Sequence, residues 1–135
     1  MMTAELLTVG SELLTGATVN TNATYLARRL AELGLVCRRQ VAVADHRRTL
    51  VEALREAIHR SGIIVMTGGL GPTFDDVTMA AVAQAAGRLL RYQPSAAAII
   101  RRFYTRRHRR LQQAALRQAL LPEGGIALPN PIGTA

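Results

Sequence analysis

The stretch that decides the fold is IIVMTGGLGPTFDD, residues 63–76. It opens with the apolar run Ile63–Met66, turns through three glycines, and leads into a segment with helical spacing that stops at Gly87. A short, fully apolar run is typical of a strand in the middle of a parallel sheet, where helices cover both faces. The stretch therefore predicts a central strand, a glycine-rich turn, and a helix from about Asp75 to Ala86.

Strand-like and helix-like segments also alternate on the N-terminal side of this stretch. Ala4–Val9 and Leu35–Val43 have the apolar patterns of strands. Asn22–Leu33 carries leucines at helical spacing and is followed by Gly34, a typical C-cap residue. A second helix follows the second strand and ends near Gly62. This alternation predicts a three-layer, doubly wound α/β fold with a mostly parallel sheet flanked by helices.

The C-terminal part of the chain is predicted to be mainly helical. A helix is expected to begin after Pro94 and to run through the arginine-rich block at residues 101–110, and a break or a second helix covers Gln112–Leu120. No internal repeat and no Pro/Gly/Ser-rich linker divides the sequence. Residues 1–135 are therefore predicted to form a single domain.

The composition is that of a globular protein. Hydrophobic residues make up 49% of the chain, and the single cysteine excludes an internal disulfide. There is no signal-peptide pattern, and no window approaches the roughly 20 apolar residues that a membrane span needs. We therefore expect a cytoplasmic protein without a membrane partner.

Positive charge is concentrated in one block. The net charge is +8, all 17 basic residues are Arg, and six of them lie between Arg101 and Arg110. Three interpretations stay open: the solvated face of an amphipathic helix, a basic rim that steers an anionic nucleotide, and polynucleotide binding. We favour the first and do not expect nucleic acid as a partner. The arginines expected on one side of the helix are Arg102, Arg106, Arg109 and Arg110.

The glycine-rich turn is the strongest functional signal. A strand that turns through glycines into a helix leaves backbone N–H groups free, and these donors attract phosphate. The turn lacks the Gly-Lys-Ser/Thr ending of a Walker loop and the spacing of the dinucleotide fingerprint. A tight turn with a purely structural role is the alternative. The predicted ligand-binding residues are Gly68, Gly69, Leu70, Gly71 and Thr73.

Two adjacent carboxylates follow the turn. Asp75 and Asp76 beside a phosphate site suggest a divalent metal such as Mg²⁺, which binds to one or two carboxylates together with substrate phosphates. The alternative for Asp76 is a capping box with Thr73. Asp75 could instead favour the helix N-terminus by its charge.

A second group of polar residues follows the other two predicted strands, and it should meet the glycine turn at the same sheet edge. Glu12 is a candidate ligand for a metal or a ring nitrogen, and the amides of Asn20 and Asn22 could read a polar heterocycle. The alternatives are that Asn22 caps the first helix, that Asn20 shapes the preceding turn, and that Asp45 caps the next helix. The predicted binding residues of this group are Ser11, Asn20, Asn22 and Asp45, with Glu12 as a catalytic candidate.

Taken together, these motifs resemble the N-terminal domain of the CinA competence/damage-inducible proteins, a branch of the molybdopterin-binding superfamily of MoaB and MogA. The resemblance covers nearly the whole chain, and the string Gly-Gly-Leu-Gly-Pro-Thr-x-Asp-Asp is specific to the CinA branch. In MoaB-like relatives the turn reads Gly-Gly-Thr-Gly, and an Arg-Asp pair stands in place of Asp75 and Asp76. The motifs that carry the resemblance are Gly10 to Leu14 with Gly16, Asn20 to Asn22, Asp45, Thr67 to Thr73 with Asp75, Asp76 and Thr78, and Asn130-Pro131 with Gly133 to Ala135.

The resemblance implies a function and its parts. It implies a homo-oligomeric domain that hydrolyses the pyrophosphate of an ADP-ribose-like substrate with a divalent metal. In that reaction Asp75 and Asp76 would hold the metal, Glu12 would assist, and the glycines would cradle phosphate. The alternative is a non-catalytic module that binds molybdopterin. Because family domains continue past Asn-Pro-x-Gly-Thr-Ala, we also expect this domain to be incomplete at its C-terminus.

Overall fold

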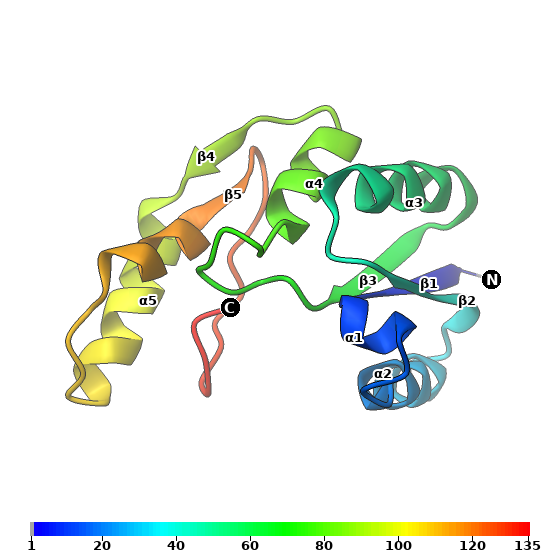
Figure 1. The fold of residues 1–135 in the computed structure, drawn as a ribbon, viewed down its shortest axis with the longest axis horizontal. Helices are drawn as coiled ribbons and strands as arrows, with labels where there is room; N and C mark the ends of the chain where they lie inside the picture. Colours follow the sequence, from blue (N-terminus) through cyan, green and yellow to red (C-terminus); the bar gives the residue numbers. More distant parts are fainter. Residues whose placement is uncertain (1) are drawn as a thin grey trace.

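A computed structural model of the chain describes residues 2–135. Figure 1 shows a sheet with helices on both sides and, beside it, a smaller group of elements that includes α5, β4 and β5. The strands are β1 (Thr3–Val9), β2 (Val36–Val43), β3 (Ile63–Thr67), β4 (Leu90–Tyr92) and β5 (Leu120–Pro122). The helices are α1 (Ser11–Leu14), α2 (Thr21–Glu32), α3 (Arg47–Arg60), α4 (Thr78–Ala85), α5 (Pro94–Arg106) and the 3₁₀ helix η1 (Gln113–Ala119).

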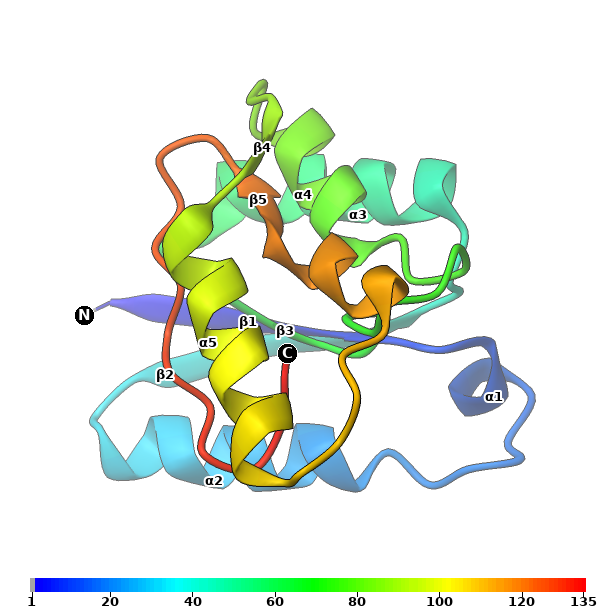
Figure 2. The same ribbon diagram turned by 90° about the vertical axis from the view of Figure 1, so that its left-hand side faces the viewer.

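The main sheet is parallel, with the strand order β2-β1-β3. Helix α2 covers one face and helices α3 and α4 cover the other (Figures 1 and 2). The expectation of a three-layer, doubly wound α/β fold is therefore confirmed. The expected place of Ile63–Met66 is wrong, because within residues 2–135 β3 pairs only with β1, and β1 is the central strand.

Alternation along β1 produces two separate cores. Ala4 and Leu6 point to the α2 side and pack with Leu30, whereas Leu7 and Val9 pack with α3 and α4 on the other side. This is the two-residue period of a strand that is covered on both faces. We call residues 3–85 the sheet unit.

The second group of elements, residues 90–122, forms what we call the hairpin unit. Strands β4 and β5 pair antiparallel, and α5 packs on η1 around a small core. These two short strands were not expected from the sequence. Helix α5 ends at Arg106, so the prediction that Arg109 and Arg110 lie on it is wrong.

None of the helices in residues 2–135 has the length and apolarity that crossing a membrane would require.

The three parallel strands end at one edge of the sheet, because Val9 pairs with Val43 and Thr8 pairs with Thr67. The segments that follow these strands therefore meet, as predicted, and they carry the polar motifs singled out above.

Candidate functional site

The glycine-rich turn is packed tightly against the rest of the sheet unit. Gly68 and Gly69 have φ angles of 94° and 62°, a region that L side chains rarely adopt. A side chain at Gly68 would collide with the carbonyl oxygen of Val9, and one at Gly69 would collide with the Thr78 hydroxyl. Both glycines therefore have a structural reason to be glycine, whether or not a ligand binds.

The turn nevertheless leaves backbone donors free. No hydrogen bond formed within residues 2–135 uses the N–H of Gly68, Gly69 or Leu70. Their carbonyl oxygens are occupied: Gly68 accepts from the Thr78 hydroxyl at 2.8 Å, and Gly69 accepts from the Thr78 N–H at 3.3 Å. Three consecutive free donors are a suitable anion-binding surface. Structural packing and anion binding thus use different atoms of the same turn.

Asp76 closes the turn on itself. Its Oδ2 accepts from the Thr73 N–H at 2.8 Å and from the Thr73 hydroxyl at 2.6 Å. This is the contact that a capping box predicts, but no helix begins there. The expected helix start at Asp75 is wrong, because α4 begins only at Thr78, after Val77.

The Asp76 carboxyl remains acidic. Its partial burial favours the neutral form, but the hydrogen bonds from Thr73 and Gly71 and the nearby charge of Arg117 outweigh that effect and lower its pKa. The side chain is therefore a carboxylate at neutral pH. Both hydrogen bonds from Thr73 go to Oδ2.

Asp75 is exposed on the same loop. Within residues 2–135 there is no group of three or more His, Cys, Asp or Glu side chains that could hold a metal ion by themselves. Mg²⁺, however, usually retains waters and binds through one or two carboxylates plus substrate phosphates. The carboxylates of Asp75 and Asp76 fit that limited protein contribution.

The glycine turn opens into a cavity of about 500 Å³ between the two units. The turn and Asp76 form one wall, α5 and η1 form another, and residues 126–135 form a third. Most of the lining is aliphatic. Of the predicted site residues, Gly69, Leu70, Gly71, Thr73 and Asp76 line this cavity.

A second, smaller cavity of about 170 Å³ lies beside the strand ends. It shares no lining residue with the larger one. Its lining is richer in polar side chains, among them those of Thr8 and Thr67. The predicted residues Glu12, Asn20, Asn22 and Gly68 line this smaller cavity. The expected single site is thus divided into two neighbouring compartments.

The alternative in which Asn22 caps the first helix is wrong. Asn20, not Asn22, caps α2: its Oδ1 accepts from the Ala23 N–H at 3.2 Å. Its amide nitrogen also donates to the buried Thr8 hydroxyl at 2.7 Å. Asn22 reaches Thr67 at the end of β3, with 3.3 Å between its Nδ2 and the Thr67 Oγ1.

Asp45 does not cap the next helix, so that prediction is wrong. Helix α3 begins at Arg47 with His46 as its N-cap residue, and the Asp45 carboxylate instead accepts a hydrogen bond from the Ser11 hydroxyl. That bond and backbone N–H groups lower the Asp45 pKa. Ser11 and Asp45 line neither cavity, and they join the segments that follow β1 and β2.

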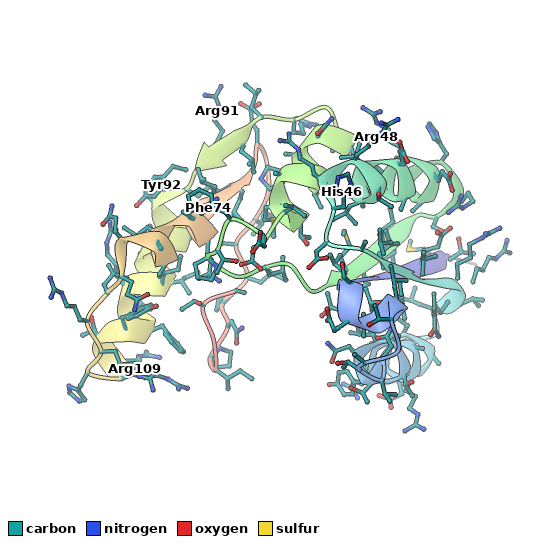
Figure 3. The ribbon with its side chains drawn as sticks, viewed as in Figure 1. His46, Arg48, Phe74, Arg91, Tyr92 and Arg109 are labelled. Atoms are coloured by element: carbon teal, nitrogen blue, oxygen red, sulfur yellow. The ribbon has the colours of Figure 1, made fainter. Side chains whose placement is uncertain are left out.

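Three residues of the larger cavity's surroundings were not found from the sequence. Arg117 of η1 lies over the exposed ring of Phe74, with 4.0 Å from its guanidinium carbon to the ring centroid. Gln118 donates from Nε2 to the Leu70 carbonyl at 2.9 Å, and its Oε1 is buried without a partner in residues 2–135. Figure 3 labels Phe74 on the loop that follows the turn, far from Arg109 at the end of the arginine block. No local pattern links positions more than 40 residues apart.

Comparisons with known proteins agree on the family. Residues 5–135 match the model of the probable molybdopterin binding domain. The chain is 44% identical over 135 residues to a CinA-like protein of Kosmotoga olearia. This match covers 99% of the chain but 32% of that protein. It is 44% identical over 132 residues to a protein of Aeropyrum pernix, covering 98% of this chain and 49% of that protein. The chain thus spans about a third to a half of these relatives.

A solved structure extends the agreement to the fold. The protein CinA of Thermoplasma acidophilum superposes with a TM-score of 0.90 at 38% identity, covering 98% of this chain and 78% of that one. The match includes the sheet with its glycine turn and the hairpin unit, since it covers almost every residue. The chain therefore belongs to the molybdopterin-binding domain family of MoaB and MogA, in its CinA-like branch.

Proposed function

We propose that this domain binds a phosphate-bearing nucleotide or pterin on the glycine turn and, with a divalent metal, hydrolyses the pyrophosphate of an ADP-ribose-like substrate. The observation that carries the proposal is the set of free N–H groups at Gly68, Gly69 and Leu70, on the same loop as the Asp76 carboxylate. N–H donors that could bind a phosphate, and a carboxylate that could bind a metal, then lie within one turn.

The division of the site suits a ligand with two ends. Gly68 lines the smaller cavity and Gly69 lines the larger one, so the turn separates them. A pyrophosphate on the turn would place one half of a dinucleotide-like ligand on each side. In the smaller cavity, Asn22 and Glu12 would face its polar groups; Ser11 and Asp45 would support that wall.

The reaction consumes one water. The water oxygen bonds to one phosphorus, the bond from that phosphorus to the bridging oxygen breaks, and ADP-ribose yields AMP and ribose 5-phosphate. A bound divalent metal would supply charge neutralisation at the phosphoryl oxygens and a more acidic water. Asp75 and Asp76 would hold it, and the free N–H groups would stabilise the charge that develops on the phosphate oxygens.

The test is release of AMP from ADP-ribose by the purified protein, with Mg²⁺ and with a chelator. We expect release only with the metal, and a loss of at least ~100-fold for Asp76→Ala, the scale on which removal of a stabilising group acts in other active sites. Glu52→Gln is the matched control, because Glu52 is an exposed carboxylate on α3 that lines neither cavity. Metal-independent release, or full activity in Asp76→Ala, would contradict the proposal.

A second candidate is a module that holds molybdopterin without turnover. The predominantly aliphatic lining of the larger cavity favours it, because a tricyclic ligand can be held there by apolar contact. A folded protein that binds molybdopterin equally well with and without metal, and that releases no AMP, would favour this candidate. We also propose a homo-oligomer, which light scattering coupled to size exclusion would test.

A further inference from the structure

Arg117 stands out in the larger cavity because of its charge. Among the residues that line this cavity it is the single basic one, and Asp76 is the single side-chain carboxylate. The negative charge of an Asp side chain in the lining would repel an anionic ligand at the turn. A fixed positive charge on the opposite wall offsets that repulsion, and Arg117 is the side chain in that position.

The hydrogen-bonding capacity of Arg117 is unused. None of the ion pairs or side-chain hydrogen bonds within residues 2–135 has the Arg117 guanidinium as donor. Its contact is instead with the Phe74 ring. A cation that lies over an aromatic face keeps the N–H groups at its edge free, and a guanidinium presents five such donors in one plane. The contact with Phe74 therefore holds Arg117 without occupying the donors that a phosphate would need.

This contact also explains an otherwise unfavourable side chain. Phe74 is 88% exposed, and it lies between the glycines and Asp76 on the same loop. One residue further along η1, the Gln118 amide binds the Leu70 carbonyl of the turn. The glycine loop and η1 are thus joined at two points, which places Arg117 beside the loop that carries the free N–H groups.

We propose that Arg117 is the ligand's anion-binding residue in the hairpin unit: it binds the phosphate or pyrophosphate that the glycine turn receives from the sheet unit, and Phe74 holds it in place. This assignment rests on the proposed phosphate-bearing ligand but not on its hydrolysis. Bidentate pairing of guanidinium with phosphate would make Arg preferable to Lys at this position.

The test is titration of the 135-residue protein with inorganic pyrophosphate in metal-free buffer, followed by calorimetry and by the NMR signals of arginine Nε–Hε groups. We expect the Arg117 signal to shift, and Arg117→Ala to weaken binding by about tenfold or more, as expected for loss of a hydrogen bond to a charged group. Arg117→Lys should bind with intermediate affinity. Phe74→Ala should weaken binding by about two- to fivefold, the scale of an exposed cation–π contact.

Arg102→Ala is the matched control, since Arg102 is an exposed arginine on α5 that lines neither cavity. It should bind pyrophosphate within about twofold of the wild type, which separates a local role from the effect of net charge. Binding by Arg117→Ala within the same range would overturn the proposal. So would an Arg117 signal in the wild type that does not respond to pyrophosphate, a result that does not depend on any variant folding.

The outcomes also separate this proposal from the proposed function. Pyrophosphate binding that depends on Arg117, without release of AMP from ADP-ribose, would contradict hydrolysis and support the role of Arg117. If Arg117→Ala releases AMP and binds pyrophosphate as the wild type does, hydrolysis is supported and the role of Arg117 is contradicted. A folded wild type that binds no pyrophosphate would overturn the role of Arg117, and the AMP-release assay with Mg²⁺ would decide hydrolysis separately.

Discussion

The sheet unit and the hairpin unit form opposite walls of the larger cavity, but their cores are built from different side chains. In the sheet unit the buried residues of α3 and β1 include Leu7, Leu50 and Leu54. In the hairpin unit, four of the five buried core residues are alanines, and Ile100 is the exception. Apolar burial contributes about 25 cal/mol per Å². The hairpin unit therefore gains much less stability from its own core than the sheet unit does.

This difference suggests that the two units contribute differently to ligand binding at the site. The glycine turn and Asp76 belong to the unit with the larger core, which can hold backbone donors in place. Arg117 and Gln118 belong to the unit with the smaller core, which can adjust to a ligand. Regions with few buried apolar contacts open locally at lower free energy. Ligand binding should therefore protect the hairpin unit more than the sheet unit.

The difference between the two cores is tested most directly by removing one large side chain from each of them. Leu54 is 3% exposed and Ile100 is 1% exposed. Leu54→Ala should lower the free energy of unfolding by about 3 kcal/mol, within the range for large-to-small core changes. Ile100→Ala should instead mainly reduce hydrogen-exchange protection within residues 90–122. Urea unfolding and native-state exchange measure both effects, and an equal loss of protection across both units in Ile100→Ala would show that they unfold as one.

A smaller effect is expected from the ion pair at the other end of the sheet. Glu5, buried in the central strand, accepts from Nε and Nη2 of Arg60 at 3.0 Å each and from the Ser61 hydroxyl at 3.0 Å. Glu5→Ala should destabilise the sheet unit by about 2 kcal/mol, less than a fully buried pair because Arg60 is partly exposed and can turn toward water. Glu56→Ala, which removes the exposed partner of Arg60, should change stability by less than about 1 kcal/mol.

The same ion pair gives a pH dependence. Hydrogen bonds from Arg60, the largest influence, lower the pKa of Glu5 despite its burial. Because the pKa is lower in the folded state than in the unfolded state, this stabilisation is present above the unfolded-state pKa and is lost as the pH falls through the folded-state pKa. Urea unfolding from pH 7 to pH 3 should show a steeper acid-side loss in the wild type than in Glu5→Ala. Parallel curves would contradict this.

The last prediction concerns the turn that faces the hairpin unit. Gly69 and Gly87 have φ angles of 62° and 64°, but a side chain at Gly87 would meet nothing within 4 Å. Gly87→Ala should therefore cost only the conformational penalty of about 1 kcal/mol. Gly69→Ala adds a collision with the buried Thr78 hydroxyl, so we expect a larger cost of at least about 2 kcal/mol and weaker pyrophosphate binding. Equal thermal stability and equal binding in the two variants would argue against a packed turn.

The elements that the sequence predicts well are those with strong local patterns. β1 and β2 alternate or run apolar, and α2 carries leucines at helical spacing, so their bounds were predicted within about two residues. α4 was predicted to begin too early, because the Thr73–Asp76 bond forms in an open turn as well as in a helix. β4 and β5 have three residues each and depend on pairing between positions about 30 residues apart, which no local pattern reveals.

The candidate site shows the same contrast between what local patterns predict and what depends on long-range contacts. The residues after each strand could be predicted to meet, because parallel strands place their carboxyl ends together. Their separation into two cavities could not, since it depends on the positive φ angles of Gly68 and Gly69. Arg117 was missed because its charge lies outside the arginine block that dominates the composition. Its partner Phe74 lies between the glycines and the two aspartates and carries no signal of its own in the sequence.

Because the glycine turn lies between the two cavities, it also affects how the two products of the proposed hydrolysis would leave the site. The cavities have no lining residue in common, so the two fragments produced over the turn would occupy different parts of the site. Each fragment could depart first, and neither would have to wait for the other. An enzyme of this form would release its products in random order, and each product alone would be a weak inhibitor that occupies half of the site.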